Sequence, residues 1–524
     1  MRWLAALAAI TTVLTVGHGN GTVDAAPASG FTESTVAAIP SPTAVESLPG
    51  GRAVVLEQDT GRIRIIDAST GQLVPAPAAQ LAICGGGERG LLGFTHDPTF
   101  ATSGRVYVFY TRSAPGAPGG CVNRVSAFVM SGNTIDPASE QVLIDNISSV
   151  NGNHNGGDLD IGADGFLYIS TGDAGSDPRG DSGSGGNNDA AQDLSLLNGK
   201  ILRVDRFTGG PAPGNPLDVP GAAVCATRGN TPATPGTWCR ELYAWGLRNP
   251  FRFAFDPNSS TTRFFVNDVG QNTREEVDLG APGANYGWNS REGQCPQGQN
   301  PPCAGPPFGI TDPIVDYGHS VGEFITAGAF VPNSAWPSLA GGYLFADGGS
   351  GNVWVRQANG VVDWANPIVT GAFGITDMAF VTEPTGTSLY YTLNGASQVR
   401  RLRIAGIAAG STLELGVTGA AGVPVDASAV VLNMTVVNAR AAGFVTVYPC
   451  GEALPTASNL NFVAGQTVPN LVIARPGVGG RVCVFADAGV DVLADVAGFF
   501  PAGSDYSPVV NPTRILDTRN GVGI

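Results

Sequence analysis

The sequence is poor in charged side chains and almost lacks lysine. Lys200 is the only lysine among 524 residues, charged residues make up 14%, and the formal net charge is −15. A chain this acidic lacks the basic surface that nucleic acids and anionic membranes bind, so we expect neither as a partner. Long helical patterns are also scarce. Short apolar runs separated by Gly, Pro, Asn and Asp dominate instead, which predicts an all-β protein.

Apolar runs of membrane-spanning length are missing as well. The one candidate, residues 3–16, follows the basic Arg2 and is too short to cross a bilayer comfortably. A short basic start, an apolar stretch and then small residues are typical of a secretory signal peptide. We therefore predict a signal peptide over residues 1–25. The rest of the chain is expected to be soluble, without a membrane span, and either secreted or held at the cell surface.

No CxxC pair of the kind that binds zinc occurs in the sequence. The eight cysteines instead fit disulfide bonds in an exported protein. Their connectivity is open from sequence alone, and we favour nearest-neighbour pairing because each bond then closes one loop or hairpin. The predicted pairs are Cys84–Cys121, Cys225–Cys239, Cys295–Cys303 and Cys450–Cys483.

Residues 31–404 repeat one theme of strand, tight turn and strand. Residues 53–67 and 159–170 are two examples, each with an apolar run on both sides of a turn that contains Asp and Gly. Small antiparallel sheets repeated over this length predict a β-propeller. A large β-sandwich is the alternative, but it needs fewer and longer strands.

The composition changes near Ala405. Residues 405–410 are small and resemble a linker, and residues 411–524 contain five or six apolar runs with Gly, Pro and Asn between them. This pattern predicts a separate β-sandwich domain. No histidine follows His319, so the domain lacks the usual acid–base groups. We interpret it as a binding or attachment module.

Histidine is rare, and one of the four histidines, His154, begins the most distinctive stretch of the chain. It precedes a predicted β-hairpin whose turn is Asp164-Gly165 and whose second strand leads into Asp173. A hairpin brings its two ends together, so His154 and Asp173 can lie side by side. A carboxylate beside an imidazole fixes its tautomer, which suits a general base. A solvated loop histidine near a turn aspartate is the alternative.

Several motifs together resemble the glucose/sorbosone dehydrogenase family in order and spacing. They are E-R-G-L-L-G-F-T-H-D-P from Glu88, H-N-G-G-D-L from His154, Y-I-S-T-G-D ending at Asp173, N-G-K-I-L-R-V-D from Asn198, G-L-R-N-P from Gly246, D-V-G-Q from Asp268 and N-Y-G-W from Asn285. The resemblance implies a six-bladed β-propeller over residues 31–404 that oxidises sugars with pyrroloquinoline quinone (PQQ). Hedgehog-interacting proteins share this domain without an established role in sugar oxidation.

The resemblance also implies roles for individual residues. His154 is expected to be the general base that takes the proton of the sugar C1 hydroxyl, and Asp173 the carboxylate that orients it. Arg248 and Asn249 are expected to contact cofactor and substrate, since an arginine can hold a carboxylate and offset charge on a reduced quinone. An ion pair between blades is the alternative for Arg248. Glu88 is expected near the substrate, where it could bond sugar hydroxyls or pair with the neighbouring arginine.

Two calcium sites are implied in the same way. The backbone carbonyls of Gly270 and Gln271 are expected to bind the ion that polarises PQQ, and Glu276 with the backbone of Tyr286 a second, structural ion. Hard cations prefer oxygen ligands, so neither site needs histidine or cysteine.

The late part of the propeller departs from the family pattern. Relatives hold the PQQ carboxylates with a lysine and a pair of arginines there, and this chain has no lysine after Lys200. The late arginines available are Arg356, Arg400, Arg401 and Arg403. Tyr317 and His319 resemble a family motif that faces the central site, and a structural role in a loop fits them equally well.

The C-terminal part resembles a module of secreted actinobacterial proteins. The motif P-T-R-I-L-D-T-R from Pro512 to Arg519 carries this resemblance, either as a closing strand or as the head of a truncated repeat. For the whole chain we expect an exported PQQ- and calcium-dependent enzyme that oxidises aldose sugars at C1 to lactones. A non-catalytic extracellular propeller that binds glycans or proteins is the main alternative. A calcium-dependent lactonase is a third, which explains His154 less well.

Overall fold

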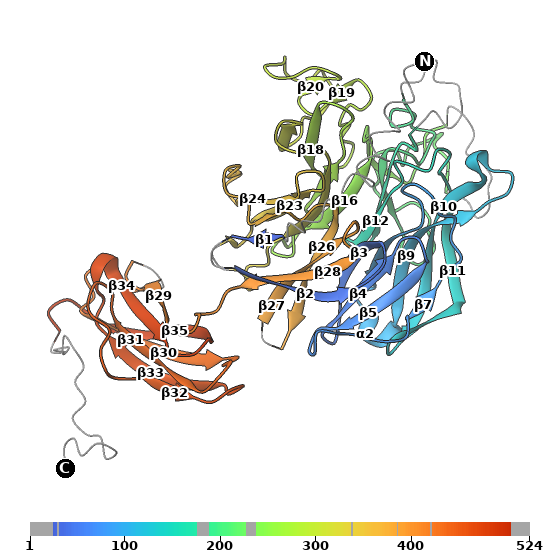
Figure 1. The fold of residues 1–524 in the computed structure, drawn as a ribbon. Helices are drawn as coiled ribbons and strands as arrows, with labels where there is room; N and C mark the ends of the chain where they lie inside the picture. Colours follow the sequence, from blue (N-terminus) through green and yellow to red (C-terminus); the bar gives the residue numbers. More distant parts are fainter. Residues whose placement is uncertain are drawn as a thin grey trace, which may run out of the picture. The chain divides into compact units, whose positions relative to one another are not determined.

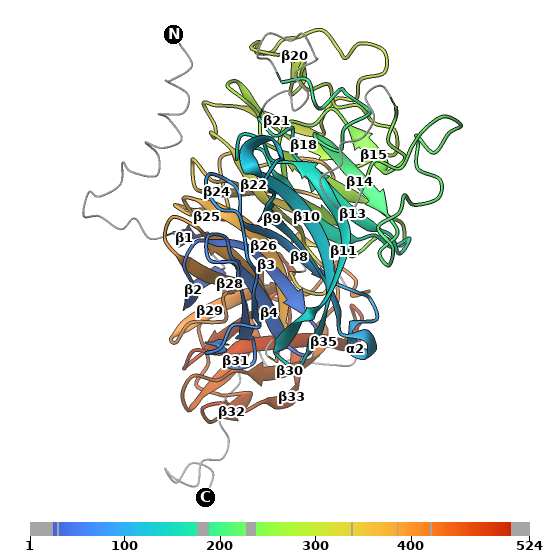
Figure 2. The same ribbon diagram turned by 90° about the vertical axis from the view of Figure 1, so that its right-hand side faces the viewer.

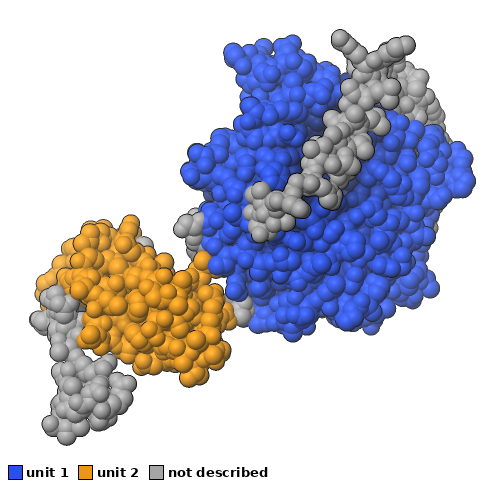
Figure 3. All heavy atoms as spheres, in the orientation of Figure 1, with its two compact units in different colours: residues 1–403 blue, residues 404–524 orange. Residues whose placement is uncertain are grey.

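The computed structural model describes residues 25–28, 31–175, 188–226, 237–336, 339–384, 386–419 and 422–504. The predicted signal peptide, apart from Ala25, and the motif from Pro512 to Arg519 lie outside these residues. The chain divides into two compact units, Met1–Arg403 and Ile404–Ile524, which Figure 3 colours separately. Within the described ranges, no helix has both the length and the apolar character needed to cross a membrane.

Small antiparallel sheets make up the described part of the first unit (Figure 1). The first sheet comprises β3 (Pro42–Leu48), β4 (Arg52–Glu57), β5 (Arg62–Asp67), β6 (Gln72–Leu73) and β7 (Ala79–Gln80). The second comprises β8 (Leu91–His96), β9 (Arg105–Ser113), β10 (Cys121–Ser131) and β11 (Thr134–Ser148). The third comprises β12 (Gly156–Ile161), β13 (Leu167–Thr171), β14 (Lys200–Val204) and β15 (Leu242–Trp245). Figure 2 shows β8, β9, β10 and β11 side by side.

Three further sheets continue the pattern. One comprises β16 (Pro250–Phe255), β17 (Phe264–Asp268), β18 (Arg274–Leu279) and β21 (Val315–Gly318). The next comprises β22 (Ile325–Phe330), β23 (Tyr343–Asp347), β24 (Asn352–Arg356), β25 (Val369–Thr370) and β1 (Ala26–Pro27). The last comprises β26 (Ile375–Glu383), β27 (Gly386–Leu393), β28 (Gln398–Ile404) and β2 (Phe31–Ala38). A small hairpin of β19 (Arg291–Glu292) and β20 (Cys295–Pro296) stands apart from these sheets.

The sheets contact one another in a closed ring. β3 packs against β8, β8 against β12, β12 against β16, β16 against β22, and β22 against β26, which returns to β3. Repeated antiparallel sheets around a common centre are an arrangement of the β-propeller type. The ring is completed by β2, which comes from the start of the chain and pairs with β28 near the end of the unit. An ion pair of 2.9 Å between Glu33 and Arg400 joins these two strands.

Apolar side chains fill the spaces between adjacent sheets. Leu56 and Ile65 of the first sheet, for example, share one buried cluster with Phe94 and Val108 of the second. Burying a side chain of this size contributes about 1.5–3 kcal/mol. The core is thus divided among the interfaces between sheets, and the nearly all-β character expected from the sequence is confirmed.

The hairpin predicted around Asp164 is confirmed. β12 pairs with β13 in antiparallel register, with Leu159 opposite Ile169. Gly165 in the turn has a φ of 80°, in the left-handed region that glycine adopts without strain. The predicted disulfide pairing is confirmed at all eight cysteines.

The second unit contains two sheets that enclose one core. Its strands are β29 (Ser411–Gly416), β34 (Arg481–Ala486), β31 (Gly443–Pro449) and β32 (Leu460–Phe462) in one sheet, and β33 (Val468–Ala474), β30 (Ala429–Val437) and β35 (Asp491–Phe500) in the other. Leu432 of β30 and Val484 of β34 belong to the shared cluster. Ile407, in the expected linker, bridges to Val490 and is buried in the same cluster.

Candidate active site

His154 and Asp173 meet at the open end of the hairpin formed by β12 and β13. His154 Nδ1 lies 2.7 Å from Asp173 Oδ1, and the two side chains are 11% and 0% exposed. His154 has a φ of 50°, a conformation that a non-glycine residue adopts only when its surroundings fix it. The structure therefore brings this predicted pair together and holds it in a defined geometry.

Both oxygens of the Asp173 carboxylate are occupied. Oδ1 also accepts the backbone N–H of Gly175 at 2.8 Å, and Oδ2 accepts the indole N–H of Trp288 at 2.8 Å. A carboxylate held in this way keeps the Nδ1 side of His154 as the donor, so that Nε2 retains its lone pair. This is the tautomer that a general base needs.

Asn249 and Glu88 connect the pair of His154 and Asp173, which we call the dyad, to distant parts of the chain. Glu88 Oε2 accepts the backbone N–H of His154 at 2.8 Å and the side-chain amide of Asn249 at 3.2 Å. Asn249 Oδ1 in turn accepts the N–H of Gly156 at 3.1 Å. Glu88 therefore bonds His154 and Asn249, and the guanidinium of Arg89 bonds elsewhere.

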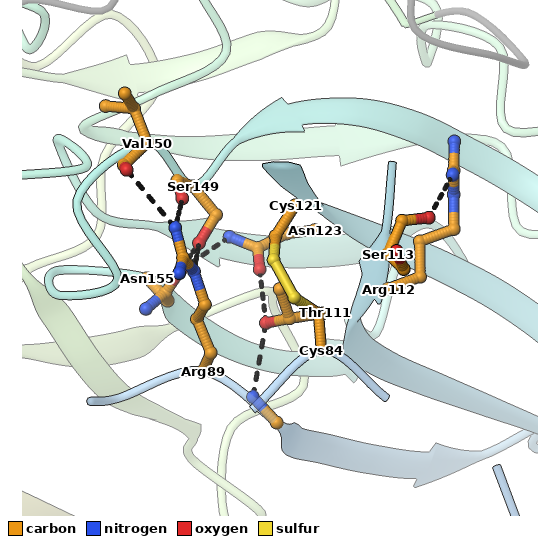
Figure 4. The surroundings of a disulfide bond; sticks show 11 residues. Cys84, Arg89, Thr111, Arg112, Ser113, Cys121, Asn123, Ser149, Val150 and Asn155 are labelled. Carbon is orange, nitrogen blue, oxygen red and sulfur yellow. Dashed lines mark hydrogen bonds between the residues drawn. A yellow bond between two sulfur atoms is a disulfide. The ribbon is translucent and has the colours of Figure 1, made fainter. Parts of the chain in front are cut away.

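Figure 4 shows where the Arg89 guanidinium lies. It donates to the hydroxyl of Ser149 at 3.1 Å, to the Ser149 carbonyl, and to the carbonyl of Val150 at 3.2 Å. Ser149 also donates to Asn155 at 2.6 Å, and Asn155 receives a second bond of 3.0 Å from Asn123. This network fixes the segment that leads into His154.

Arg248 lies beside the dyad and makes no ion pair among the described residues. Its Nη1 donates to the carbonyls of Val269 and Gly270 at 3.0 and 2.7 Å, and its guanidinium carbon lies 5.6 Å from the centre of the Trp288 ring. Its Nε is buried without a hydrogen-bond partner. A buried donor of this kind is costly to leave unpaired, so an anionic or carbonyl ligand next to Arg248 fits the site.

The residues expected at the first calcium site are only partly gathered. The Gly270 carbonyl accepts a hydrogen bond from the Arg248 guanidinium, so its oxygen points toward that side chain. Gln271 is exposed. Its backbone N–H donates to Glu292 Oε1 at 2.7 Å. The loop thus presents a carbonyl toward Arg248, whereas the carboxylates of Glu275 and Glu292 accept the backbone N–H groups of Gly270 and Gln271 at 3.0 and 2.7 Å.

Glu276 belongs to a denser group of oxygens. Asp268, Glu276 and Asp278 each place one carboxylate oxygen within 4.8 Å of the other two, and all three residues are buried. Asp268 is opposite Glu276 in the β17–β18 register, and Asp278 follows Glu276 on the same face of β18. We call these three residues the carboxylate trio. Tyr286 is buried close by, and burial followed by the charge of Asp278 raises the pKa of its phenol.

The carboxylate trio forms no ion pair among the described residues, and the one cationic influence on it there is the charge of Arg248, which opposes the effect of burial and lowers the pKa of Asp268. Both oxygens of Asp278 and Oε2 of Glu276 are buried without a hydrogen-bond partner. Burial raises the pKa of Glu276 and of Asp278 well above the ordinary range, and raises that of Asp268 to about 7. Unpaired buried carboxylates of this kind fit a hard divalent cation, which takes carboxylate oxygens. Another group of possible ligands, Cys225, Cys239 and Glu241, is closed to metal because its cysteines form a disulfide.

The other expected residues lie in separate interactions. His319 Nε2 is 2.9 Å from Glu275 Oε1, and the Tyr317 hydroxyl donates to Asp347 at 2.9 Å. Arg400 and Arg401 pair with Glu33 and Glu383 at 2.9 and 3.1 Å. These two late arginines therefore form ion pairs with carboxylates outside the group around His154.

Sequence reasoning missed four contributors: Trp288, Asp268, Asp278 and Glu292. Trp288 closes the N-Y-G-W motif, and its indole N–H is the signal that could have suggested a partner for Asp173. The spacing of Glu276 and Asp278 by two residues in a strand could have placed both on one face. Asp268 begins the D-V-G-Q motif, but its position opposite Glu276 depends on strand pairing. Glu292 has no local signal, because its role depends on loop closure.

Comparisons with known proteins agree on the first unit. A family model described as Glucose / Sorbosone dehydrogenase matches residues 39–359. The chain is 28% identical over 360 residues to the HIPL2 protein of Arabidopsis thaliana, covering 57% of this chain and 47% of that protein. It is 26% identical over 265 residues to the aldose sugar dehydrogenase YliI of Escherichia coli, covering 50% of this chain and 63% of the relative. The chain thus spans about half to two thirds of the length of these relatives.

A solved structure shares the fold. The PQQ-bound form of the aldose sugar dehydrogenase of Streptomyces coelicolor superposes with a TM-score of 0.52 at 24% identity. The match covers 72% of this chain and 99% of that one.

Proposed function

The chain belongs to the glucose / sorbosone dehydrogenase family, and we propose that it is an exported PQQ- and calcium-dependent enzyme that oxidises aldose sugars at C1 to lactones. The observation that carries this proposal is the 2.7 Å contact between His154 Nδ1 and Asp173 Oδ1, with Arg248 beside it. The six sheets of residues 31–404 are, in this proposal, the blades of a six-bladed β-propeller. Residues 411–524 form a β-sandwich module for attachment, with residues 405–410 between them.

His154 removes the proton of the sugar C1 hydroxyl through Nε2. Asp173 accepts the Nδ1–H bond and stabilises the imidazolium that results. PQQ, when bound, supplies the two-electron acceptor, so that the hydride leaves C1 as the C–O double bond of the lactone forms. Glu88 accepts the backbone N–H of His154 and the side-chain amide of Asn249, so the two residues position the base and can meet sugar hydroxyls.

Arg248 is the residue best suited to hold a PQQ carboxylate. Its Nε is buried and lacks a partner, and its guanidinium is close to the Trp288 ring. An anion at this guanidinium satisfies the orphaned donor and offsets charge on the reduced quinone. The PQQ-bound relative with the same fold supports the choice of cofactor.

Calcium is proposed at two places. The carboxylate trio, with Tyr286 beside it, is the better-supplied site, because its three carboxylates are buried close together and two of them, Glu276 and Asp278, have unpaired oxygens. Asp268 also accepts the backbone N–H groups of Arg248 and Asn249 at 2.8 and 2.6 Å. A cation in the trio therefore stabilises the loop that carries Arg248. The carbonyls of Gly270 and Gln271 are the proposed ligands of the ion that polarises PQQ.

A non-catalytic extracellular propeller that binds glycans or proteins is the second candidate. It is favoured by the commitment of Arg400 and Arg401 to Glu33 and Glu383, and by the absence of lysine after Lys200. Both features reduce the number of late cationic side chains that could hold the carboxylates of PQQ. The HIPL2 relative, whose name states no enzymatic activity, is compatible with it.

Sugar oxidation by the purified full chain separates the two candidates. The wild-type protein with calcium and PQQ is assayed by dye reduction against a panel of aldoses, beside His154→Ala and the control His96→Gln. His96 is the matched control because it lies on β8 and contacts Phe100, not the dyad. We expect the His154 variant to lose about 10²- to 10⁴-fold in kcat, the usual contribution of a general base, and the control to keep its rate. Equal rates for wild type and His154→Ala would refute the proposal.

A further inference from the structure

Glu292 receives an unusual number of backbone hydrogen bonds. Its Oε1 accepts the N–H groups of four consecutive residues, Gln271, Asn272, Thr273 and Arg274, at 2.7, 2.8, 2.8 and 3.0 Å. Its Oε2 accepts the hydroxyl of Thr273 at 2.6 Å. Convergent backbone N–H groups of this kind form a concave anion-binding nest. Here the anion is supplied by the chain itself.

The nest dictates where the carbonyls of the loop point. In a trans peptide the C=O of one residue is antiparallel to the N–H of the next. Since the four N–H groups converge on Glu292, the carbonyls that precede them are directed away from it. Gly270 provides a direct check, because its carbonyl accepts the Arg248 guanidinium at 2.7 Å. The loop is closed so tightly at Gly270 that an added Cβ would meet the Arg274 carbonyl at 1.6 Å.

Glu292 itself is rigidly presented. It is 3% exposed and lies on β19, where it pairs with Cys295 of β20. The β20 strand is held by the disulfide bond of Cys295 with Cys303, and the β19 strand by the ion pair of 3.0 Å between Arg291 and Asp312. Burial alone raises the pKa of Glu292, but the hydrogen bonds from Thr273 and its neighbours outweigh burial and lower it below the ordinary value. Both oxygens of Glu292 accept hydrogen bonds from the loop, which is the geometry of a carboxylate held in a nest.

We infer that Glu292 is a positioning residue of the active site. By holding the N–H groups of residues 271–274, it turns the carbonyls of the loop toward Arg248 and toward the cation expected at Gly270 and Gln271. Its effect on catalysis rests on the proposed function, whereas its effect on the loop does not. A merely structural hairpin anchor would change stability alone. A positioning residue also changes calcium affinity and kcat.

Chemical rescue separates these two roles. In Glu292→Gly the four N–H groups lose their acceptor, and a small carboxylate such as formate can enter the emptied nest. Glu292→Gln keeps an acceptor oxygen but loses the charge, and charge-assisted bonds are about twice as strong as neutral ones. The matched control is Asp205→Gly, which removes a carboxylate that accepts the N–H groups of Phe207 and Thr208 in a turn far along the chain from the loop.

Four readouts are taken on the full chain: exchange of the amides of residues 271–274, affinity for calcium alone, PQQ titration, and kcat with KM for an aldose. We expect Glu292→Gly to exchange these amides at least tenfold faster and to lose roughly 10- to 100-fold in calcium affinity and kcat, as for other residues that orient metal ligands. Formate should restore part of each loss. Glu292→Gln should give values between those of Glu292→Gly and those of the wild type. Asp205→Gly should match the wild type. Thermal unfolding identifies a variant that fails to fold, in which case Glu292→Gln decides.

The outcomes keep this inference apart from the proposed function. If the wild type binds calcium and oxidises sugar, and Glu292→Gly and Glu292→Gln match it with or without formate, the inference is wrong. If the wild type neither binds PQQ nor oxidises sugar, the proposed function fails. The amide exchange then still decides whether Glu292 holds the loop. Loss of stability without any change in calcium affinity, kcat or formate response would reduce Glu292 to a structural anchor and overturn its positioning role.

Discussion

Asp173 and the carboxylate trio both contact the Arg248-Asn249 segment, and the surroundings of Asp173 differ from those of Asp278 in the trio. Asp173 is fully buried and accepts hydrogen bonds from His154, Gly175 and Trp288. Asp278 is equally buried, yet neither of its oxygens has a partner among the described residues. A paired carboxylate can orient a base, whereas an unpaired one needs a proton or a cation.

The difference assigns separate tasks to the two groups. The Asp173 side is complete as folded and carries the proposed proton transfer. The carboxylate trio is complete only when its charge is balanced, and it acts on the active site through Asp268, which holds the backbone of Arg248 and Asn249. The following changes test this division.

Asp173→Asn should have the largest effect. The amide can still bond Trp288 or Gly175, but it no longer favours the Nδ1–H tautomer of His154 or stabilises the imidazolium. We expect kcat for aldose oxidation to fall by about 10²- to 10⁴-fold with PQQ binding retained, since the loss falls on the base alone. Dye-coupled kinetics and an equilibrium PQQ titration measure the two quantities separately. A wild-type kcat would show that Asp173 has no orienting role.

Asp278→Asn should change stability in opposite directions with and without calcium. In chelator the variant should be more stable than wild type, because a buried carboxyl without a partner has been removed. With calcium at about 100 times its Kd, wild type should gain about 2.7 kcal/mol in the free energy of unfolding, and the variant much less. Urea unfolding with calcium and with chelator measures both. The same calcium gain in both proteins would exclude the trio as the site.

Trp288→Phe should have an intermediate effect. The ring contact with Arg248 is kept in part, and only the indole N–H bond to Asp173 Oδ2 is lost. We expect kcat to fall about tenfold, the lower end for residues that orient a functional group, with KM nearly constant. A fall in PQQ affinity at unchanged kcat would mean that Trp288 serves the cofactor instead of Asp173.

His319→Gln should give the smallest effect. The hydrogen bond to Glu275 raises the pKa of His319 above its ordinary value of 6.5. The folded state therefore holds this proton more tightly than the unfolded state, so the stabilisation is full below pH 6.5 and is lost as the pH rises through the folded-state pKa. Because His319 is partly exposed, we expect about 1 kcal/mol or less. Urea unfolding of both proteins at several pH values measures it, and a difference that grows with pH would contradict the assignment.

Much of the fold and the centre of the candidate site could be predicted from sequence, because those features are local. The hairpin at Asp164 follows from a turn and its flanking strands, and it places the two ends of one short segment together. The disulfides likewise join near neighbours. The resemblance of the motifs then led to Arg248, Asn249 and Glu88, which the structure gathers around the same backbone.

The remaining contributors depend on contacts that no local pattern encodes. Trp288 reaches Asp173 across 115 residues, and Asp268 meets Glu276 through strand register. Glu292 reaches its nest through a disulfide-closed hairpin. The family resemblance implied Gly270 and Gln271 as calcium ligands, but no local pattern indicated that the Arg248 guanidinium donates to the Gly270 carbonyl.

Titration of the calcium-loaded full chain with PQQ, followed by absorbance and by dye-coupled oxidation of several aldoses, tests the central claim most directly. We predict saturable binding at micromolar PQQ and sugar-dependent dye reduction that His154→Ala abolishes while still binding PQQ. No binding at micromolar PQQ, with no sugar oxidation, would contradict the account and favour the second candidate, a non-catalytic propeller that binds glycans or proteins.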